Sequence, residues 1–163
     1  MQAGINTNKP FKAIAAALSF SPYCMTILSE AKRLSDAFGA SLVMFHVGEK
    51  TSEKEATLNS MLKNLNIDYD SSRMIWMEGK EVPTILELCK LNAIDLLVLG
   101  ARAKENLVKF YIGSVARKIS RKASCSVMLI TNNQEKPVEY NTFVVNGNND
   151  NTKTFYTIHT ALY

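Results

Sequence analysis

The spacing of apolar residues restricts the fold of this chain more than any other feature of its sequence. Five apolar runs are too short to form helices and predict buried strands: residues 13–18, 41–47, 73–77, 95–100 and 126–130. Each run except the last is followed by a segment that predicts a helix, so we expect four helices. Such regular alternation requires a parallel sheet with helices on both faces. The sequence therefore predicts an α/β fold with a doubly wound, five-stranded parallel sheet.

Local signals indicate where the helices begin and end. Ser21 and Pro22 have the pattern of an N-cap and a first helical residue, and Gly39 stands where the first helix would stop. Ser52 and Glu55 have the spacing of a capping box at the start of the second helix. In doubly wound sheets ligands bind beyond the carboxyl ends of the strands. The segments after the first and fourth strands are therefore the leading candidates for a site.

The last part of the chain is expected to lie outside the α/β domain. We divide the chain into an extension at residues 1–10, a domain at 11–131 and a polar linker at 132–139. Residues 140–163 resemble the beginning of the chain and are predicted to form a strand and then a helix. This tail is either the start of a second repeat or an element that docks on, or is swapped between, sheets. Docking would cover the fifth strand, which is apolar on both faces and would otherwise promote aggregation.

The composition of the chain indicates the cellular compartment in which we expect the protein. No apolar run approaches the roughly 18–20 residues that cross a bilayer, and the N-terminus has no signal-peptide pattern. The three cysteines are odd in number and widely spaced, which predicts neither a disulfide framework nor a zinc site. We therefore expect a cytoplasmic protein that does not contact membranes.

Basic residues gather in one part of the chain. Seven lysines and arginines and one acid lie between Arg102 and Lys122, whereas the net charge of the whole chain is +4. Such a stretch forms the solvated face of the fourth helix or attracts phosphates. Nucleic-acid binding is the weaker alternative, and it would use Arg117, Lys118, Arg121 and Lys122 with a steep dependence on salt.

The segment after the fourth strand contains widely spaced glycines. Gly100 is followed by two residues, then by Ala103, nine further residues, and Gly113 with Ser114. Gly100 lets the backbone turn sharply and approach a ligand closely. Gly113 and Ser114 open the predicted fourth helix, which we expect to end at Lys122, and the N–H groups and dipole of a helix start attract anions. The Ser114 hydroxyl can cap this helix or bond a phosphate oxygen.

This pattern resembles the universal stress protein family, and the resemblance extends from about Phe11 to Thr131. Family members that bind nucleotides have a glycine, two residues, a second glycine, nine residues, and a glycine followed by serine or threonine. The resemblance implies a flavodoxin-like sheet, similar to adenine-nucleotide alpha-hydrolases, with strand order 3-2-1-4-5 and a homodimer formed through the fifth-strand edge. It also implies a regulatory role in the stress response, with ATP or another adenine nucleotide, and magnesium with it, as ligands.

By the same resemblance, a set of positions in this chain faces the nucleotide. The residues on the adenosine side are Ala17, Ser19 and Val47. The residues on the phosphate and ribose side are Leu99, Gly100, Arg102, Gly113, Ser114 and Val115. Ala103 stands where the nucleotide-binding members have their second glycine.

Two of these positions depart from the family pattern and leave two functions open. At Ala103 a positive φ costs on the order of 1 kcal/mol, and the Cβ atom crowds a phosphate. Ser19 stands where the family usually has an aspartate, so this position can form a hydrogen bond to adenosine but supplies no charge. The chain is therefore a nucleotide-binding regulator, or a nucleotide-free module that dimerises and acts through protein partners.

Other reactive residues lack partners that would make a catalytic or metal site. His46 is expected to be a core or rim histidine near the end of the second strand, and Cys24 is expected to pack as a small hydrophobe in the first turn of a helix. The sequence contains no nucleophile elbow, metal-binding histidine pair, Walker loop or CxxC motif. We expect no dedicated catalysis and no metal site, with slow ATP turnover or self-phosphorylation left open.

Overall fold

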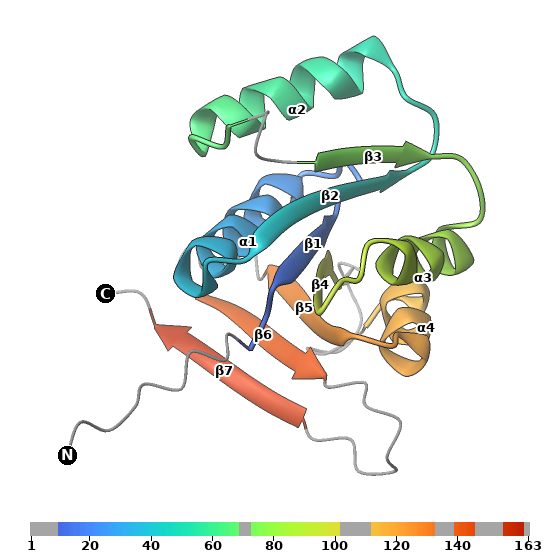
Figure 1. The fold of residues 1–163 in the computed structure, drawn as a ribbon. Coiled ribbons are helices and arrows are strands. Elements are labelled where there is room, and N and C mark those ends of the chain that lie inside the picture. The colour runs from blue at the N-terminus through green and yellow to red at the C-terminus, as the bar shows by residue number, and fades with distance from the viewer. Residues whose placement is uncertain (1–9, 69–72, 102–111, 133–138, 146–154, 162–163) are drawn as a thin grey trace, which may run out of the picture.

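The chain forms one seven-stranded sheet with helices on both faces (Figure 1). The computed structural model describes residues 10–68, 73–101, 112–132, 139–145 and 155–161. The parallel strands are β1 (Ala13–Ala17), β2 (Ser41–Val47), β3 (Arg73–Met77), β4 (Leu96–Gly100) and β5 (Ser126–Asn132). Their order, β3-β2-β1-β4-β5, confirms the predicted fold. Two further strands, β6 (Glu139–Val145) and β7 (Phe155–Ala161), extend the sheet beyond β5 in antiparallel orientation.

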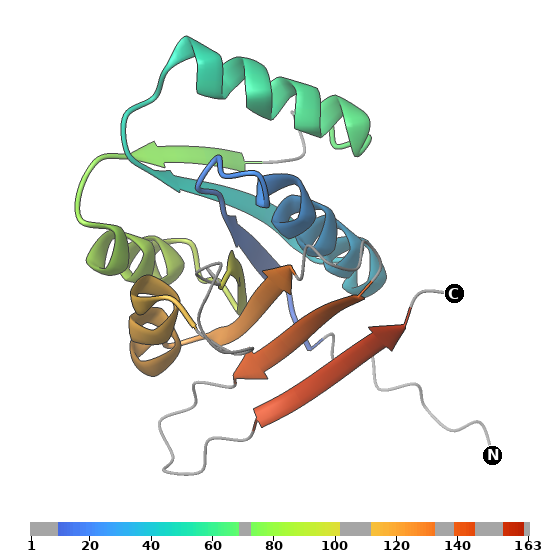
Figure 2. The same cartoon turned by 180° about the vertical axis from the view of Figure 1, so that it is seen from behind.

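Each face of the parallel sheet packs against one pair of helices. The helices α1 (Cys24–Phe38) and α2 (Ser52–Asn64) cover one face, and α3 (Glu81–Leu91) and α4 (Ser114–Lys122) cover the other (Figures 1 and 2). Side chains alternate between the faces along a strand, so Met44 joins the core under α1 and α2 whereas Phe45 joins the core under α3 and α4. Full burial of one such side chain contributes about 1.5–3 kcal/mol.

Two helix starts differ from the predicted ones, by one or two residues. The first helix begins at Cys24 instead of Pro22, because Ser21 carbonyl oxygen accepts the Cys24 N–H and closes a separate turn before the helix. The second helix is capped by Thr51 instead of Ser52, since the Thr51 hydroxyl accepts the Lys54 N–H at 3.3 Å. Gly39 ends α1 with φ of 58°, as predicted.

The end of the chain is a β-hairpin, so the predicted helix in the tail is wrong. The last described element, β7, pairs along its whole length with β6, from Val145 opposite Phe155 to Glu139 opposite Ala161. Its sequence, FYTIHTA, consists largely of aromatic and β-branched residues, which favour strands over helices. The prediction of a helix rested on the similarity of residues 140–163 to the beginning of the chain, and the strand propensity of this segment was given less weight. The residues expected to form the linker include the last residue of β5 and the first of β6, with 133–138 between them outside the described residues.

The hairpin covers the edge that the sequence predicts for dimerisation. In the described chain β6 pairs with β5 from Val127 opposite Val145 to Asn132 opposite Tyr140. The core side chains of β5 are divided between the two faces as expected, with Met128 in one cluster and Leu129 in the other. No helix among the described residues is long and apolar enough to cross a bilayer.

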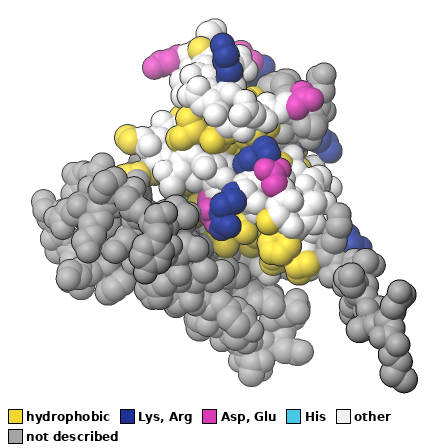
Figure 3. Space-filling view, turned by 90° about the vertical axis from the view of Figure 1, so that its left-hand side faces the viewer, with side chains coloured by type: hydrophobic (Ala, Val, Ile, Leu, Met, Phe, Trp, Pro, Cys, Tyr) yellow, Lys and Arg dark blue, Asp and Glu magenta, His cyan; other side chains and the backbone are white. Residues whose placement is uncertain are grey.

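Charged side chains on the α1 and α2 side are mixed in sign. Figure 3 shows acidic and basic side chains next to one another there. On α1, Lys32 pairs with Asp36 and Arg33 pairs with Glu30. These charges are therefore largely neutralised in place, and this face has no extended patch of one sign among the described residues.

Candidate functional site

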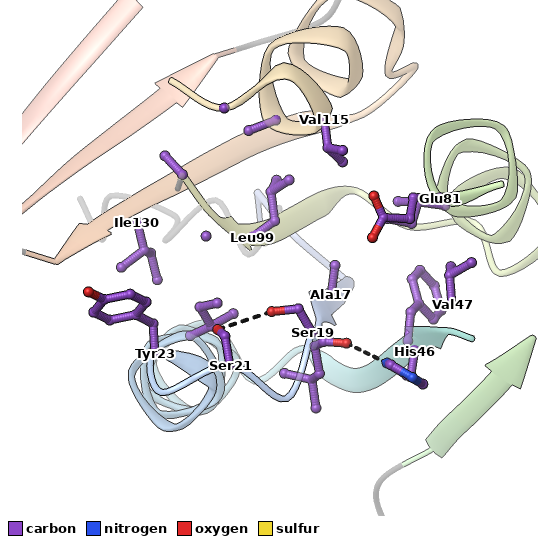
Figure 4. Close-up of a pocket in the computed structure, with 18 of the residues that line it drawn as sticks. Ala17, Ser19, Ser21, Tyr23, His46, Val47, Glu81, Leu99, Val115 and Ile130 are labelled. Atoms are coloured by element: carbon purple, nitrogen blue, oxygen red, sulfur yellow. Dashed lines mark hydrogen bonds between the residues drawn. The ribbon is translucent and has the colours of Figure 1, made fainter. Parts of the chain in front are cut away.

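A cavity of about 300 Å³ opens at the carboxyl edge of the sheet. Its floor is formed by the ends of β1, β2 and β4, and its walls are formed by the first turns of α1, α3 and α4 (Figure 4). The parallel register brings these ends together, because Ala17 lies opposite both Phe45 and Leu99. The cavity therefore occupies the position that the doubly wound topology predicts for a ligand.

Most of the predicted site residues line this one cavity. The described ones that do so are Ala17, Ser19, Val47, Leu99, Gly100, Gly113, Ser114 and Val115. Gly100 and Ser114, which are 14 positions apart in sequence, thus face the same space. Arg102 and Ala103 lie outside the described residues, so their predicted contacts stay predictions.

Three helices begin at the cavity, and none of them has a side-chain cap. The N-cap residues are Tyr23 for α1, Lys80 for α3 and Gly113 for α4. In contrast, α2 does not contribute to the cavity lining and is capped by Thr51. The first N–H groups of an uncapped helix seek acceptors and carry the positive end of the helix dipole. The arrangement therefore favours an anion at the cavity.

The start of α4 provides the donors closest to the glycine motif. Gly113 has an extended backbone with φ of −57° and ψ of 156°, and Ser114 is the first helical residue. The hydroxyl of Ser114 does not cap the helix. Of its two predicted roles, a hydrogen bond to a phosphate oxygen is the one that stays open. The residues Ser114, Val115 and Ala116 all line the cavity. Their N–H groups belong to the first turn, where an intrahelical acceptor is lacking.

Gly100 lies in a strand and not in a turn, and its lack of a side chain matters for packing. It is the last residue of β4, pairs with Ile130, and its φ lies outside the left-handed region. A Cβ atom at this position would lie 3.0 Å from Cδ1 of Ile27, a residue of α1 that is 2% exposed. The predicted role in a sharp turn is therefore wrong. The missing side chain instead lets α1 approach the floor of the cavity.

The β1–α1 connection is fixed by a buried histidine. The carbonyl oxygen of Leu18 lies 2.8 Å from Nδ1 of His46, and a carbonyl can only accept, so Nδ1 carries the proton. Phe20, which has φ of 53°, stacks on Trp76 with ring centroids 5.5 Å apart, and both rings contact His46 edge-on. His46 is 5% exposed, as expected for a core or rim histidine. These contacts hold Ser19, whose hydroxyl donates to Ser21 Oγ at 3.1 Å, beside the cavity.

Three chemically useful residues in the lining were missed by sequence reasoning. Figure 4 shows Tyr23 and Glu81 on opposite sides of the cavity, with Ser21 beside Tyr23. Glu81 is the only charged side chain among the described residues of the lining. It lies in the first turn of α3, which follows β3 and therefore starts at the same sheet edge. The alternation of strands and helices contains this signal, because every helix of a parallel α/β unit starts near the carboxyl edge.

Cys24 is the first residue of α1 and packs in the core on the side of that helix. It is 3% exposed, and burial raises the pKa of its thiol although backbone hydrogen bonds at Phe20 and Ser19 act to lower it. This confirms the expected packing role. Among the described residues no group of three or more histidine, cysteine or acidic side chains is placed to hold a metal ion.

Solved structures with this fold are found among universal stress proteins. A universal stress protein in complex with cAMP is 18% identical with a TM-score of 0.61, and the match covers 73% of this chain and 95% of that one. UspA from Lactobacillus plantarum is 19% identical with a TM-score of 0.53 over 72% of this chain and 96% of that one. A universal stress protein from Archaeoglobus fulgidus DSM 4304 is 19% identical with a TM-score of 0.62, but the match covers 77% of this chain and 45% of that one.

Sequence comparison places the domain in the same group. The family model of the universal stress protein family matches residues 10–131, which agrees with the range of the resemblance noted in the sequence. Among the described elements, this match includes the four helices and, except for Asn132 at the end of β5, the five parallel strands. The chain therefore belongs to the universal stress protein family.

Proposed function

We propose that this protein is a stress-response regulator that binds an adenine nucleotide in the cavity at the carboxyl edge of its sheet. The observation that carries the proposal is the convergence of three uncapped helix starts on one cavity, while the helix that starts elsewhere has its own cap. A fold relative has been solved with cAMP, which is an adenine nucleotide. The first observation favours an anion, and the second favours an adenine base attached to it.

The lining supports one orientation of the nucleotide. Phosphate oxygens would accept from the N–H groups at the start of α4, near Ser114 and Gly100. The adenosine would lie toward Ala17 and Val47, where Figure 4 also places Glu81. A carboxylate there can accept from ribose hydroxyls and would repel a phosphate, so it favours the same orientation.

A pair of matched substitutions tests this site. Ser114 and Ser52 are both exposed first residues of helices, but only Ser114 lines the cavity. Glutamate at a first helical position is compatible with the dipole, so both variants should fold. Calorimetric titration with ATP, ADP, AMP and cAMP, with and without magnesium, should show affinity reduced at least about tenfold in Ser114→Glu, because like charges repel. Ser52→Glu should bind like the unmodified protein.

The titration also separates this function from its alternative. No binding heat with any of the four nucleotides would contradict the proposal and favour a nucleotide-free module that acts through protein partners. Equal losses in Ser114→Glu and Ser52→Glu would also contradict it, because the effect would then not depend on the cavity. Binding to DNA or RNA that falls steeply with salt would instead favour the exposed basic residues of α4.

Ala103 provides a second test, at a position outside the described residues. If its Cβ atom hinders a phosphate, Ala103→Gly should tighten binding by up to about tenfold, because a left-handed alanine costs on the order of 1 kcal/mol. The comparison uses the same titration and the unmodified chain. An unchanged affinity would show that the alanine is not the obstacle.

We further propose binding without dedicated turnover, in a reducing cytoplasm. The cavity lining offers Glu81 and the engaged imidazole of His46, but they lie on different elements and do not form a nucleophile with its base. The three cysteines are free and buried, which suits a reducing compartment. We also propose a homodimer. Because β6 pairs with β5, a dimer through the β5 edge requires β6 either to detach from β5 or to extend the sheet toward the second chain.

A further inference from the structure

A pair of free cysteines lies at the opposite end of the sheet from the ligand cavity. Cys89 belongs to α3, and Cys125 precedes β5, 36 positions later. Both flank the same short segment, because the Cys89 carbonyl accepts the Ile94 N–H at 2.9 Å and the Asp95 carbonyl accepts the Ser126 N–H at 3.0 Å. The two side chains belong to one buried cluster and form a thiol–thiol hydrogen bond.

The two thiols differ in how easily they lose their protons. The hydrogen bond from Cys89 lowers the pKa of Cys125, against the effects of burial and the Asp95 charge. The same bond, followed by burial, raises the pKa of Cys89. Of the two thiols, Cys125 therefore loses its proton more readily, and Cys89 is the donor in their hydrogen bond. The thiolate is the form that reacts with oxidants.

Cys125 can be reached by a small oxidant from the surface. It lines a second cavity, of about 390 Å³, together with Phe11, Ser124 and Ser126. This cavity lies beside the amino ends of β4 and β5, and it does not include Cys89. An oxidant in the cavity would meet Cys125 first, with Cys89 behind it.

We propose that Cys89 and Cys125 form a peroxide-sensitive dithiol that closes to an intramolecular disulfide. The Cys125 thiolate attacks one oxygen of a hydroperoxide, the O–O bond breaks, and the departing hydroxide takes up a proton as water. The Cys89 sulfur then attacks the resulting sulfenic acid, the S–O bond breaks, and the hydroxide leaves as a second water with the Cys89 proton. Two thiols and one hydrogen peroxide thus give one disulfide and two waters, with two electrons passing from sulfur to peroxide.

The pairing of the two thiols explains why the sulfenic acid formed at Cys125 can go on to a disulfide. In the reduced protein the two thiols share a hydrogen bond that Cys89 donates, and this bond favours proton loss from Cys125. The Cys89 side chain belongs to the same buried cluster as Cys125 and is its hydrogen-bond partner, so the second thiol is at hand for the next step. Cys24, which has no thiol in contact among the described residues and a pKa raised by burial, provides an internal control.

Peroxide treatment of the reduced full chain tests the proposal. After removal of reductant, the protein is exposed to hydrogen peroxide, quenched, denatured and alkylated with N-ethylmaleimide, then measured by intact and peptide mass spectrometry. We expect one alkylated thiol, Cys24, and a peptide containing Cys89 linked to one containing Cys125. Cys125 should be consumed at least about tenfold faster than Cys24, since its thiolate fraction is larger.

Single substitutions define each role. Cys24→Ser should still form the internal disulfide. Cys125→Ser should keep both remaining thiols reduced, whereas Cys89→Ser should accumulate sulfinic acid at Cys125 because no resolving thiol is present. Three alkylated thiols after treatment of the unmodified chain, disulfides only between chains, or oxidation of Cys24 at the rate of Cys125 would overturn the proposal. The unmodified chain and Cys24→Ser decide the matter by peptide mapping even if the other variants fail to fold.

Discussion

At the scale of single residues, the contact between β4 and α1 shapes the floor of the ligand cavity. Gly100 has no side chain, and Ile27 occupies the space next to it while it also lines the cavity. A buried core transmits even a small change in volume, because its packing density is close to that of an organic crystal. The pair therefore links the stability of the fold to the volume that remains for a ligand.

We expect Gly100→Val to destabilise the protein by about 1–3 kcal/mol and Gly100→Ala to destabilise it less, because the new atoms crowd Ile27. Ile27→Val removes the atom that would clash, so in the Gly100→Ala background it should cost less than the roughly 0.5–1.5 kcal/mol that it costs alone. Urea unfolding of the two single variants and the double variant measures this coupling. Additive losses would show that the two residues are not in contact.

Individual contacts of the site were only partly predictable from sequence. Ser114 was identified from the glycine motif and Val47 from the resemblance to the family, and both line the cavity. The contact between His46 and the Leu18 carbonyl was not predicted, since it joins positions 28 apart through the geometry of two strands. A single sequence gives the periodicity of each strand but not the side-chain orientation across strands.

At the scale of elements, the starts of the helices divide into capped and uncapped ones. The capped helix, α2, satisfies its own first turn with Thr51. The other three helices were predicted in position, but the cap of the first was wrong because Ser21 closes a turn of its own. Serine, threonine and aspartate are common both at N-caps and in turns, so neighbouring candidates such as Thr51 and Ser52 cannot be ranked from sequence.

We expect Thr51→Ala to lower the free energy of unfolding by about 1 kcal/mol, since it removes the acceptor of the Lys54 N–H. The neighbouring change Ser52→Ala should stay within roughly 0.5 kcal/mol of the unmodified protein, because Ser52 is exposed and is not the cap. Thermal or denaturant unfolding of the two variants compares them directly. A larger loss of stability in Ser52→Ala than in Thr51→Ala would show that Ser52 is the cap, as the capping-box pattern in the sequence suggested.

At the scale of the whole molecule, the parallel sheet followed from the sequence and its extension did not. Alternating apolar runs and helical segments leave few topologies, so the parallel sheet with helices on both faces was predicted correctly. The hairpin was missed because a repeat-like similarity was given more weight than the strand propensity of residues 155–161. Local propensity was the better guide there, since the β5 edge offers a ladder of hydrogen bonds to any strand that can reach it.

Amide hydrogen exchange tests the seven-stranded arrangement. In β6 every N–H should be protected, because the strand has a neighbour on each side and its amides point alternately to β5 and β7. In β7 protection should alternate between residues, because its second side has no neighbour in the described sheet. Equally fast exchange across 139–145 and 155–161 would show that the hairpin is not docked.

The sheet has different strands at its two ends, and this restricts how copies of the chain can join edge to edge. If β7 of one chain pairs with β7 of a second copy, a two-fold axis relates the two chains. This contact occupies the β7 edge of each chain, so assembly through that edge stops at two chains. Contact of β3 with β7 leaves one edge open on each new chain and would continue as a filament. Whether assembly at the β7 edge stops at a closed dimer therefore depends on the symmetry of the contact and not on the affinity between the strands.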